Sequence, residues 1–445
     1  MASSTIVLLD REQRGVHYRD LCKAFDAVWI DPDRVPDSDT LCRADLCIVS
    51  DEYYWHNTLT MLDLARHGVP TLHIADGVVE WRNTWENPRS QTADQGMPLF
   101  QPVLAHKIAC ISRSQTRILE SWGNLGKCEV VGVPRFDSLL GRQPRARSLQ
   151  GPFRLLIMTA KTPGFTPAQI DRVSQSLCDL RAALAAPVFD QPRIEPVWRV
   201  TGGLADEIGI PNTLRDTTGA DLAEVLPTVD AVITTPSTSM LEGMLQGVPV
   251  ALLDYNNCPH YVPAAWRITA REHLLEVLRE LLAPPATKML YQQTILHDNL
   301  ECHSPATPRM VQLVEAMVRR GQDCRARGEP LSFPRRMLPD KQDGHHLPEA
   351  DFDLARLYPD HPVFGNMDRT RLQVELGHLR VAFQSQSVLH KAEIAGLQAE
   401  IARLRTVAQT QRARLERIET HPLLGTLLRL RRRILRLPHA TDSPD

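Results

Sequence analysis

Short apolar runs alternate with amphipathic stretches through the first third of the chain. The runs that predict strands lie at 6–9, 27–30, 46–49, 71–74, 108–111 and 130–131. Apolar residues recur with helical spacing between some of these runs, near 57–66 and 114–122. Strands that alternate with helices indicate crossover connections and a mostly parallel sheet with both faces covered. We therefore predict a Rossmann-like domain over residues 1–140.

The alternation restarts after 141–152, a polar stretch that is rich in turn residues and has no apolar period. Predicted strands lie at 154–159, 195–201, 230–235 and 248–254, and predicted helices at 167–186, 237–246 and 270–282. Two successive units of this kind predict an α/β fold with two Rossmann-like domains facing a cleft, the second over 153–323. Open parallel sheets bind ligands at the carboxyl ends of their strands, so we expect the chemistry there.

The pattern changes twice beyond the second domain. Residues 324–368 are rich in Pro, Asp, Arg and His and lack a period, which predicts a linker or an irregular wrap over the core. Residues 369–420 then contain a heptad repeat from 394 to 418, preceded by an earlier apolar frame at 372–383 that is displaced by a stutter. Polar Gln411 in the repeat can fix the register while weakening the packing. We predict a coiled coil that joins copies of the chain into a homo-oligomer; one long helix folded back on the core is the alternative. The seam positions are Ile394, Leu397, Ile401, Leu404, Ala408, Gln411, Leu415 and Ile418.

Residues 421–438 combine leucines with five arginines and contain no acidic residue. This composition fits a short basic amphipathic helix that lies on an anionic membrane surface. The alternatives are an ordinary solvated helix end and a basic strip that pairs with another subunit. We predict a peripheral contact with the inner face of the membrane.

Composition sharpens this picture and excludes several classes of protein. The chain has 51 Lys+Arg against 53 Asp+Glu, a formal net charge of −2, so a general nucleic-acid binder is not expected. The nine cysteines are scattered and form no C-x-x-C pair, which predicts reduced thiols in a cytoplasmic protein. No apolar run approaches the roughly 18 residues that span a bilayer. The near-neutral average conceals an acidic-leaning core and the basic end.

The stretch 230–254 is the most informative for chemistry. A buried strand ends in Thr-Thr-Pro, and Ser237, Thr238 and Ser239 follow at the start of a helix, with Glu242 one turn further on. The free N–H groups and the dipole of a helix N-terminus favour phosphate, and the carboxylate can accept hydrogen bonds from a ribose. The alternative is that the hydroxyls only cap a structural helix. Three hydroxyls and an acid at a strand end favour a nucleotide site.

This stretch resembles the nucleotide-binding motif in the C-terminal domain of GT-B glycosyltransferases. The resemblance is closest to the bacterial surface-polysaccharide branch, with capsule Kdo transferases, CDP-glycerol glycerophosphotransferases and sugar-nucleotide 2-epimerases. Residues 130–137, Val-Val-Gly-Val-Pro-Arg-Phe-Asp, are similar to the Gly-x-Pro-x-x-Asp stretch that closes the N-terminal domain of these proteins. The layout agrees over about residues 1–320. The resemblance implies that the three hydroxyl residues hold the nucleotide phosphates and that Glu242 holds the ribose.

A third stretch, at 72–85, resembles the Asp-Gly-Phe-x-Arg-Ser loop of capsule transferases. Here Val78 replaces the aromatic residue, and Trp-Arg-Asn at 81–83 replaces Arg-Ser. Asp76, at the carboxyl end of a strand, is our first candidate for the general base that withdraws a proton from an acceptor hydroxyl. Glu80 is the second candidate, and the two can divide the roles if their environments separate their pKa values.

The same loop supplies the predicted acceptor residues. Trp81 and Trp85 offer flat faces to a sugar ring, and Arg82 offers a charge to a carboxylate or phosphate, beside Asn83. The alternative is structural, because Asp-Gly is a strong turn signal and tryptophan pairs often pack together.

Other strand ends supply further donor-side candidates. Lys161 can neutralise a phosphate, Arg199 and Thr201 end the next strand, and His260 can contact the phosphates or assist proton transfer. A P-loop, a G-x-G-x-x-G fingerprint and a hydrolase elbow are absent from the sequence, so ATPase, classical NAD and hydrolase functions lack support. We expect neither a metal nor a cofactor, with the nucleotide sugar as substrate.

These features predict a GT-B glycosyltransferase that moves a sugar from a nucleotide-sugar donor to a lipid-linked or surface-glycan acceptor, such as O-antigen or capsule, at the cytoplasmic face of the membrane. A CDP-polyol phosphotransferase or a sugar-nucleotide epimerase on the same fold is the first alternative. An epimerase gives no reason for the basic end. The second alternative is a non-catalytic scaffold that binds a nucleotide and recruits partners through its coiled coil.

Overall fold

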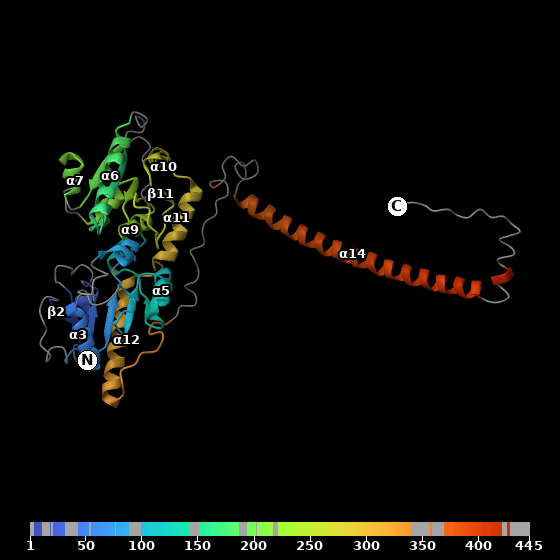
Figure 1. Cartoon of the computed structure of the whole chain (residues 1–445), viewed down its shortest axis with the longest axis horizontal. Coiled ribbons are helices and arrows are strands. Elements are labelled where there is room, and N and C mark those ends of the chain that lie inside the picture. The colour runs from blue at the N-terminus through green and yellow to red at the C-terminus, as the bar shows by residue number, and fades with distance from the viewer. Residues whose placement is uncertain are drawn as a thin grey trace. The chain divides into compact units, whose positions relative to one another are not determined.

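The structure is a computed structural model of the whole chain. It describes residues 4–10, 18, 21–31, 43–52, 55–75, 77–88, 99–141, 151–186, 194–201, 203–216, 221–339, 357, 369–420 and 425–427. The chain divides into two compact units, Met1–Asp351 and Phe352–Asp445 (Figure 1). The first unit contains two parallel sheets, and the second contains one long helix.

The first sheet has six parallel strands in the order β2-β1-β3-β4-β5-β6. Their bounds are β1 Thr5–Leu9, β2 Asp26–Ile30, β3 Leu46–Val49, β4 Thr71–Ile74, β5 Lys107–Cys110 and β6 Cys128–Val130. The connections include helices α1 (Leu21–Ala24), α3 (Trp55–Arg66) and α5 (Arg113–Leu119), the last of which continues as η4 (Glu120–Asn124). Each predicted strand of this domain is present and matches its expected position to within two residues.

The second sheet has five parallel strands in the order β11-β10-β9-β7-β8. The strands are β7 Phe153–Met158, β8 Ile194–Arg199, β9 Ala231–Thr234, β10 Val250–Leu253 and β11 Trp266–Ile268. The helices are α6 Pro167–Leu184, α7 Leu204–Glu207, α8 Leu222–Val225, α9 Ser239–Leu245, α10 Leu274–Leu282 and α11 Ala286–Asn299. The prediction of an α/β fold with two Rossmann-like domains is confirmed, although the sequence analysis did not predict β11 and α11.

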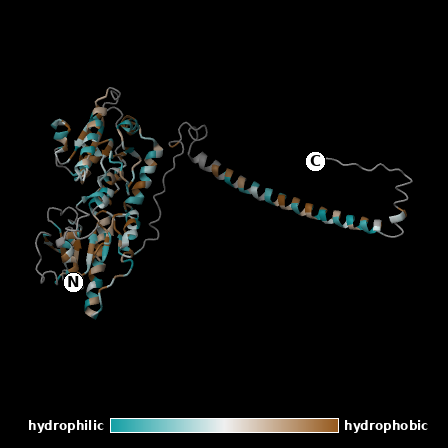
Figure 2. Ribbon diagram, viewed as in Figure 1, coloured by the Kyte–Doolittle hydropathy of each residue, from teal (hydrophilic) through white to brown (hydrophobic). Residues whose placement is uncertain are grey.

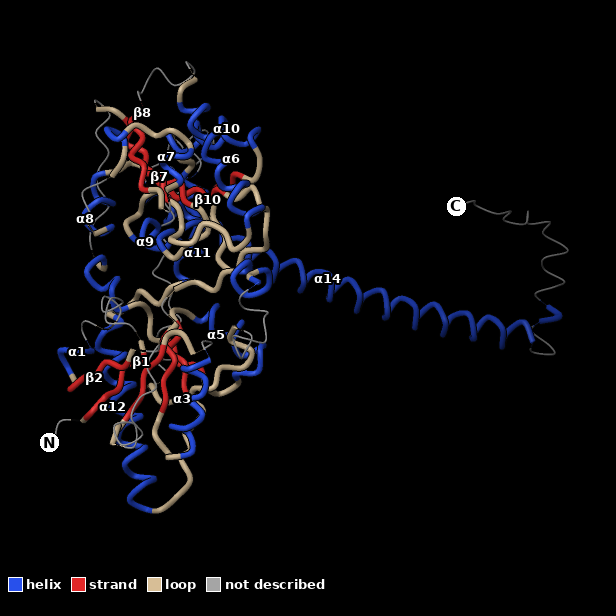
Figure 3. The backbone as a smooth tube through the Cα atoms, turned by 60° about the vertical axis from the view of Figure 1, so that its left-hand side comes forward, coloured by secondary structure: helices blue, strands red, loops and turns tan. Residues whose placement is uncertain are grey.

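Helices cover both faces of the second sheet, and Figure 3 shows its strands enclosed by them. Ile157 and Ile233 point to one face, where they pack with residues of α6 and α10. Leu156 and Val232, one position earlier in each strand, point to the opposite face and pack with residues of α9 and α11. Alternate side chains of a strand point to opposite faces, so a sheet covered on both sides needs continuous apolar strands.

Helix α12 (Ala306–Arg327) follows the second domain in sequence but packs on the first sheet. Its side chains Met310 and Met317 are fully buried in a cluster with Ile6 and Leu72. The boundary predicted at residue 323 therefore does not follow the packing, because 306–323 belong with the first sheet. An amphipathic pattern marks a helix but does not say which sheet it covers.

The start of α12 is held by the stretch similar to Gly-x-Pro-x-x-Asp. The Asp137 carboxylate accepts hydrogen bonds from the backbone N–H groups of Ala306 and Thr307, at 2.7 and 2.8 Å. Gly132 has a φ of +94°, and a Cβ at this position would lie 2.8 Å from the carbonyl oxygen of Glu301. The stretch is thus a structural junction, in which a carboxylate caps the helix that returns to the first domain.

A buried ion pair ties the segment after α12 to the first sheet. Lys107 is fully buried and donates to the Glu129 carboxylate at 2.9 Å and to the carbonyl of Pro334 at 2.7 Å. Glu129 in turn accepts from the N–H of Met337 at 2.7 Å. Both charges are hydrogen-bonded, as burial requires, so the first part of the predicted linker 324–368 is an irregular wrap that follows the end of α12.

The described part of the second unit is mainly α14 (Arg369–Thr420), a helix of 52 residues that matches the bounds predicted for the coiled coil. Its pairing with another helix remains a prediction. Of the predicted basic helix at 421–438, only 425–427 are described, and they are helical. In the part of the chain that the structure describes, no helix is long and apolar enough to cross a membrane.

We expect Asp137→Ala to lower the free energy of unfolding of the first unit by about 1–2 kcal/mol, because the first turn of α12 loses its cap. Urea denaturation of the full chain measures the loss. Asp323→Ala, which removes an exposed carboxylate from the same helix, is the matched control and should change stability by less than about 0.5 kcal/mol. Equal stability of the two variants would contradict the capping role.

Candidate functional site

Four neighbouring strands of the second sheet carry the predicted donor residues at their carboxyl ends. Lys161 follows β7, Thr201 follows β8, residues 237–239 follow β9, and His260 follows β10. Strands β8 and β9 lie on opposite sides of β7, so the strand order reverses between β7 and β9. Doubly wound sheets bind their ligands outside the carboxyl ends of the strands at such a reversal. The predicted donor residues thus surround the usual ligand position of this fold class.

Threonine hydroxyls hold the ends of these strands together. The N–H of Ala160 donates to Thr235 Oγ1 at 2.7 Å, which links the residues after β7 and β9. Thr201 Oγ1 donates to the carbonyl of Ala160 at 2.7 Å, and its N–H donates to Thr159 Oγ1 at 3.0 Å. Thr201 therefore links the ends of β7 and β8 at the base of the site. Lys161 is exposed at its edge.

The three hydroxyl residues before and at the start of α9 have different surroundings. Ser237 Oγ accepts hydrogen bonds from the N–H and from the hydroxyl of Ser239, at 3.3 and 3.0 Å. Thr238 Oγ1 accepts instead from the N–H of Val78 in the first domain, at 3.0 Å. The sequence motif of the second domain thus meets the loop after β4, which carries the predicted catalytic and acceptor residues.

Gly77 permits this approach of the two domains. A Cβ at residue 77 would lie 2.1 Å from Thr238 Oγ1, far inside the contact distance of a carbon and an oxygen atom. The Gly77 carbonyl also accepts from Gln115 Nε2 at 2.8 Å, which fixes the loop to the first domain. Asp76, the first candidate for the general base, lies outside the described residues, and its role remains a prediction.

Glu242 is 6% exposed and forms an ion pair with a residue of the first domain. Arg135 Nη1 donates to Glu242 Oε1 at 2.6 Å. Burial raises the pKa of Glu242 above its ordinary value, while the charges of Arg135 and Arg199 oppose this rise. Arg199 itself lies 3.2 Å from Asp216 Oδ2. The predicted ribose acceptor is thus a buried acid that a guanidinium orients.

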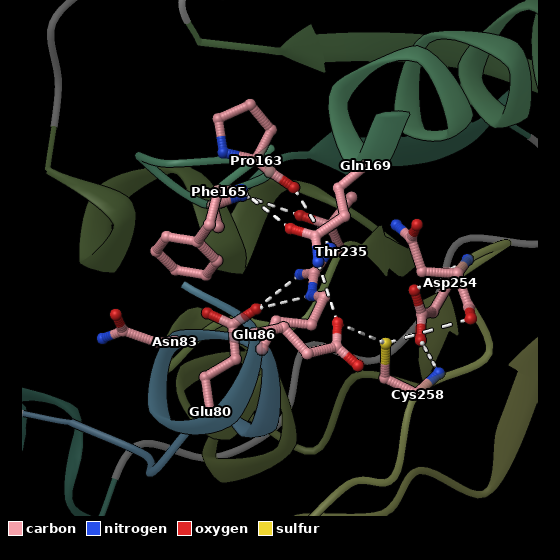
Figure 4. Close-up of polar contacts among 12 residues, drawn as sticks. Glu80, Asn83, Glu86, Pro163, Phe165, Gln169, Thr235, Asp254 and Cys258 are labelled. Carbon is pink, nitrogen blue, oxygen red and sulfur yellow. Dashed lines mark hydrogen bonds and ion pairs between the residues drawn. The ribbon is translucent and has the colours of Figure 1, made fainter. Parts of the chain in front are cut away.

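Arg82 forms a second bridge between the domains, beside Glu80, which Figure 4 shows near Pro163 of the second domain. Arg82 is fully buried and donates from Nε and Nη2 to Glu80 Oε1, at 2.9 and 2.5 Å. Its Nη1 donates to the carbonyl of Pro163 in the second domain, at 3.3 Å. Burial raises the pKa of Glu80, and the Arg82 charge opposes the rise. Arg82, predicted to meet the acceptor, therefore serves in this arrangement to orient Glu80.

An acid–histidine pair lies close to Glu80. His260 Nε2 is 3.1 Å from Asp254 Oδ2, and both side chains are at least nine-tenths buried. Burial raises the pKa of Asp254, but the close contact with His260 and the charges of Arg82 and His260 outweigh burial and hold it below the ordinary value. The Asp254 carboxylate also accepts from the N–H of Cys258, at 3.1 Å. The loop after β10 thus holds a fixed carboxylate against an imidazole at the edge of the site.

The sequence matches no protein-family model and no curated protein. MnaA of S. aureus, solved with UDP, is a similar structure with a TM-score of 0.50 and 12% identity over 71% of this chain and 97% of that chain. The two domains form a GT-B fold. The expected resemblance to GT-B enzymes is thereby confirmed, and at this identity it concerns the fold alone.

Two further solved structures have similar coverage. A variant of the wall teichoic acid polymerase TagF, solved with CDPG, has a TM-score of 0.49 and 12% identity over 71% of this chain and 89% of that chain. The UDP-GlcNAc 2-epimerase of Methanocaldococcus jannaschii, with UDP-GlcNAc and UDP, has a TM-score of 0.45 and 12% identity over 70% of this chain and 99% of that chain.

An aromatic cluster lines one side of the GT-B interface between the domains. The ring of Trp81 lies 5.8 Å from that of Trp85 and 6.1 Å from that of Tyr261. Trp122 packs edge-on against both Trp85 and Tyr261, and Trp85 Nε1 donates to the Tyr261 hydroxyl at 3.0 Å. Asn83 accepts from Asn87 Nδ2 at 2.9 Å. The predicted tryptophans therefore pack against each other and the second domain, as the structural alternative requires, and contact with a sugar remains a prediction.

A cavity of about 500 Å³ adjoins this cluster at Tyr261. Helix α5 contributes Arg113 and Arg117 to its wall, and α11 contributes Tyr291 and His297. Polar and aromatic side chains around a cavity of this size can accommodate a sugar residue. Among the residues that the structure describes, no three His, Cys, Asp or Glu side chains are placed to hold a metal ion.

Some residues that act across the interface were not predicted from the sequence. Arg135 lies within the quoted stretch 130–137, but nothing local indicates that it reaches Glu242. Glu86 Oε2 accepts from Gln169 Nε2 at 2.8 Å, and Cys258 Sγ lies 3.9 Å from the same oxygen (Figure 4). These contacts cross between the two domains, and no local pattern of the sequence indicates such a pairing.

We expect Gly77→Ala and Thr238→Ala to be non-additive, because the first places a methyl group against the Thr238 hydroxyl. Gly77→Ala alone should lower the free energy of unfolding by about 1–3 kcal/mol through overpacking, and Thr238→Ala alone by about 1 kcal/mol through a lost hydrogen bond. The loss in the free energy of unfolding of the double variant should be smaller than the sum of the two single losses by at least about 1 kcal/mol. Urea unfolding of the four proteins measures this coupling, and simple additivity would refute the contact.

Proposed function

We propose that the protein is a glycosyltransferase that takes a sugar from a nucleotide-sugar donor. The observation that carries this proposal is the meeting of the two predicted motifs at the strand-order reversal of the second sheet. Thr238, in the predicted phosphate-binding stretch, accepts a hydrogen bond from Val78, in the predicted acceptor loop. A donor bound beside residues 237–239 would therefore have its reacting sugar near the loop that carries the candidate bases.

The donor side supplies anion and ribose contacts in this proposal. The serine hydroxyls at 237 and 239, with nearby backbone N–H groups, bind the phosphates, and Lys161 adds a positive charge as the nucleotide departs. Glu242 accepts from the ribose, and Arg135 holds its carboxylate in place. These groups compensate the negative charge that develops on the phosphate of the departing nucleotide, so we propose a reaction that needs neither a metal nor a cofactor.

The transfer step needs one base. An acceptor hydroxyl attacks the anomeric carbon, its proton passes to a carboxylate, and the bond between the anomeric carbon and the phosphate oxygen breaks, leaving the nucleotide. Asp76 is the first candidate for this carboxylate, and Glu80 is the second. Burial raises the pKa of Glu80 toward the working pH, which is a property of general bases.

The acceptor is proposed to be a surface glycan or its lipid-linked precursor. The cavity beside Tyr261 offers room for a sugar residue next to the aromatic cluster. The arginine-rich segment 421–438 suits a contact with anionic lipid, which would bring the enzyme to the cytoplasmic membrane face where such acceptors are found.

A thermal-shift screen with CMP-, UDP-, GDP- and CDP-linked sugars tests donor binding. We expect the melting temperature to rise with one nucleotide class, because a ligand that binds the folded state raises stability by mass action. Glu242→Gln should weaken that binding about tenfold or more, the loss of a charge-assisted hydrogen bond. Glu276→Gln, which changes an exposed acid on α10, is the control and should bind like the wild type. Equal binding by the Glu242 variant would remove this residue from the donor site.

Turnover of the donor identified in the screen distinguishes the two candidate bases. The variant that removes the base, Asp76→Asn or Glu80→Gln, should lose at least about a hundredfold in kcat with donor binding retained. If Glu80 is the base, the rate of the wild type should rise with pH as Glu80 loses its proton. The midpoint of this rise should lie above the ordinary pKa of a glutamate, because burial raises the pKa of Glu80. An isomerised nucleotide sugar formed without acceptor would instead identify an epimerase, and transfer of a polyol phosphate would identify the phosphotransferase alternative.

A further inference from the structure

An apolar seam runs along α14, and its side chains from 394 to 415 are exposed in the described part of the chain. Every residue from 390 to 417 is exposed, including the large apolar residues at the a and d positions of the heptad repeat. The exposed fractions are 51% for Ile394, 60% for Leu397, 50% for Ile401, 54% for Leu404 and 60% for Leu415. Figure 2 shows the alternation of apolar and polar residues along this helix. Because long helices gain most of their stability from packing of an apolar face, this seam needs a partner helix.

The identity of the seam residues favours two strands. The two heptads that begin at Ile394 and Ile401 have β-branched isoleucine at a and leucine at d, the combination that favours dimers in parallel coiled coils. Only the heptad with Leu415 at a and Ile418 at d has the reverse combination, which favours higher oligomers. The layer of Ala408 and Gln411 lies between them and is the least apolar of the seam.

We propose that α14 pairs with α14 of a second copy of this chain, in parallel and in register. The occupant of the seam is thus the same helix, and the a and d residues of one copy pack on the same residues of the other. The choice of a parallel arrangement rests on two features of the seam and its flanks, the polar layer and the charges beside it.

The polar layer favours the parallel arrangement. In a parallel pair in register, Gln411 faces Gln411 of the second copy, and the two amides can hydrogen-bond to each other. In an antiparallel pair that overlaps the same segment, an a residue faces a d residue, and Gln411 faces Ile401. A glutamine against an isoleucine leaves an amide without a partner in an apolar layer, which is unfavourable.

The charges that flank the seam also favour the parallel arrangement. Glu400 occupies a g position, and Arg405 occupies the e position five residues later, which is the spacing at which flanking residues meet across a parallel pair. A parallel dimer thus gains two symmetric Glu400–Arg405 pairs. The antiparallel pair would place Glu400 near Arg414 but would also place Arg405 against Arg405. In the single chain Glu400 pairs with Arg403, at 3.0 Å, one turn along its own helix.

Cysteine cross-linking of the full chain tests the direction. Gln411→Cys should form a disulfide-linked dimer under mild oxidation, because facing d positions of a parallel pair lie within disulfide range. Ala413→Cys, at the f position opposite the seam, is the matched control and should stay monomeric on the gel, as should the wild type with its nine native cysteines. Light scattering of the reduced protein should give about 100 kDa, twice the 50.1 kDa of the chain.

Two results of this experiment would overturn the proposal. In the antiparallel pair the two copies of residue 411 would be about 15 Å apart along the axis, ten residues of helix, and only a mixture of Ile401→Cys and Gln411→Cys chains would cross-link. A monomer, or a mass of three or more chains, would refute the two-stranded seam itself.

Charge exchange provides an independent test. Glu400→Lys alone and Arg405→Glu alone should each raise the dissociation constant of the dimer, by roughly threefold to tenfold, and combining the two in one chain should restore it. The matched control combines Glu400→Lys with Arg414→Glu, which would restore only an antiparallel dimer. Restoration by the control and not by the first pair would contradict the parallel arrangement. Neither substitution touches the proposed active site, so this result is independent of the proposed function.

Discussion

The architecture of the first unit depends on the return of α12 to the first sheet. The helix follows α11 of the second domain, yet Met310 and Met317 are buried in the core of the first. The Asp137 carboxylate fixes where the helix begins, and Gly132 leaves room for the chain that leads into it. Because α12 follows the second domain in sequence but packs on the first sheet, separating the two sheets would expose apolar area that this helix buries. The contacts of the candidate site that cross between the domains, such as Arg135–Glu242 and Val78–Thr238, need the two sheets to stay in this arrangement.

The sheets were predictable because parallel strands covered on both faces are mostly apolar along their length. The run 46–49 is apolar throughout and, at this length between helical patterns, favours a strand, and 71–74 was still recognisable although Thr71 and His73 within it are buried polar residues. Strand β11 was not predicted because it has only three residues and exposes Arg267. Helix α11 was not predicted because two of its buried residues, Gln292 and Asn299, are polar and form hydrogen bonds with the backbone. A polar residue buried in this way carries no signal in the hydrophobic pattern.

The site was predictable in its location but not in its pairings. Strand-end reasoning placed the donor residues after four strands, and the sheet order makes those strands neighbours. It could not find that Arg135 pairs with Glu242, or that Arg82 reaches the carbonyl of Pro163, because both contacts cross between domains. Such partners depend on the relative placement of two separately folded sheets, which no local pattern encodes. The sequence also assigned Arg82 to a ligand, whereas burial makes its main partner the Glu80 carboxylate.

Association through α14 would give the arginine-rich end a property that one chain lacks. A single short basic segment binds an anionic surface weakly, and two segments joined in one particle bind far more tightly because the second contact is intramolecular. A parallel pair brings residue 420 of both copies to the same end of the helix, about 78 Å from residue 369 for 52 residues in α-helical geometry. An antiparallel pair with Gln411 facing Ile401 would place residue 420 beside residue 392 of the second copy, and the two basic segments would begin about 42 Å apart, 28 residues of helix. The direction of the coiled coil therefore decides whether the two segments that follow it can act on one patch of membrane.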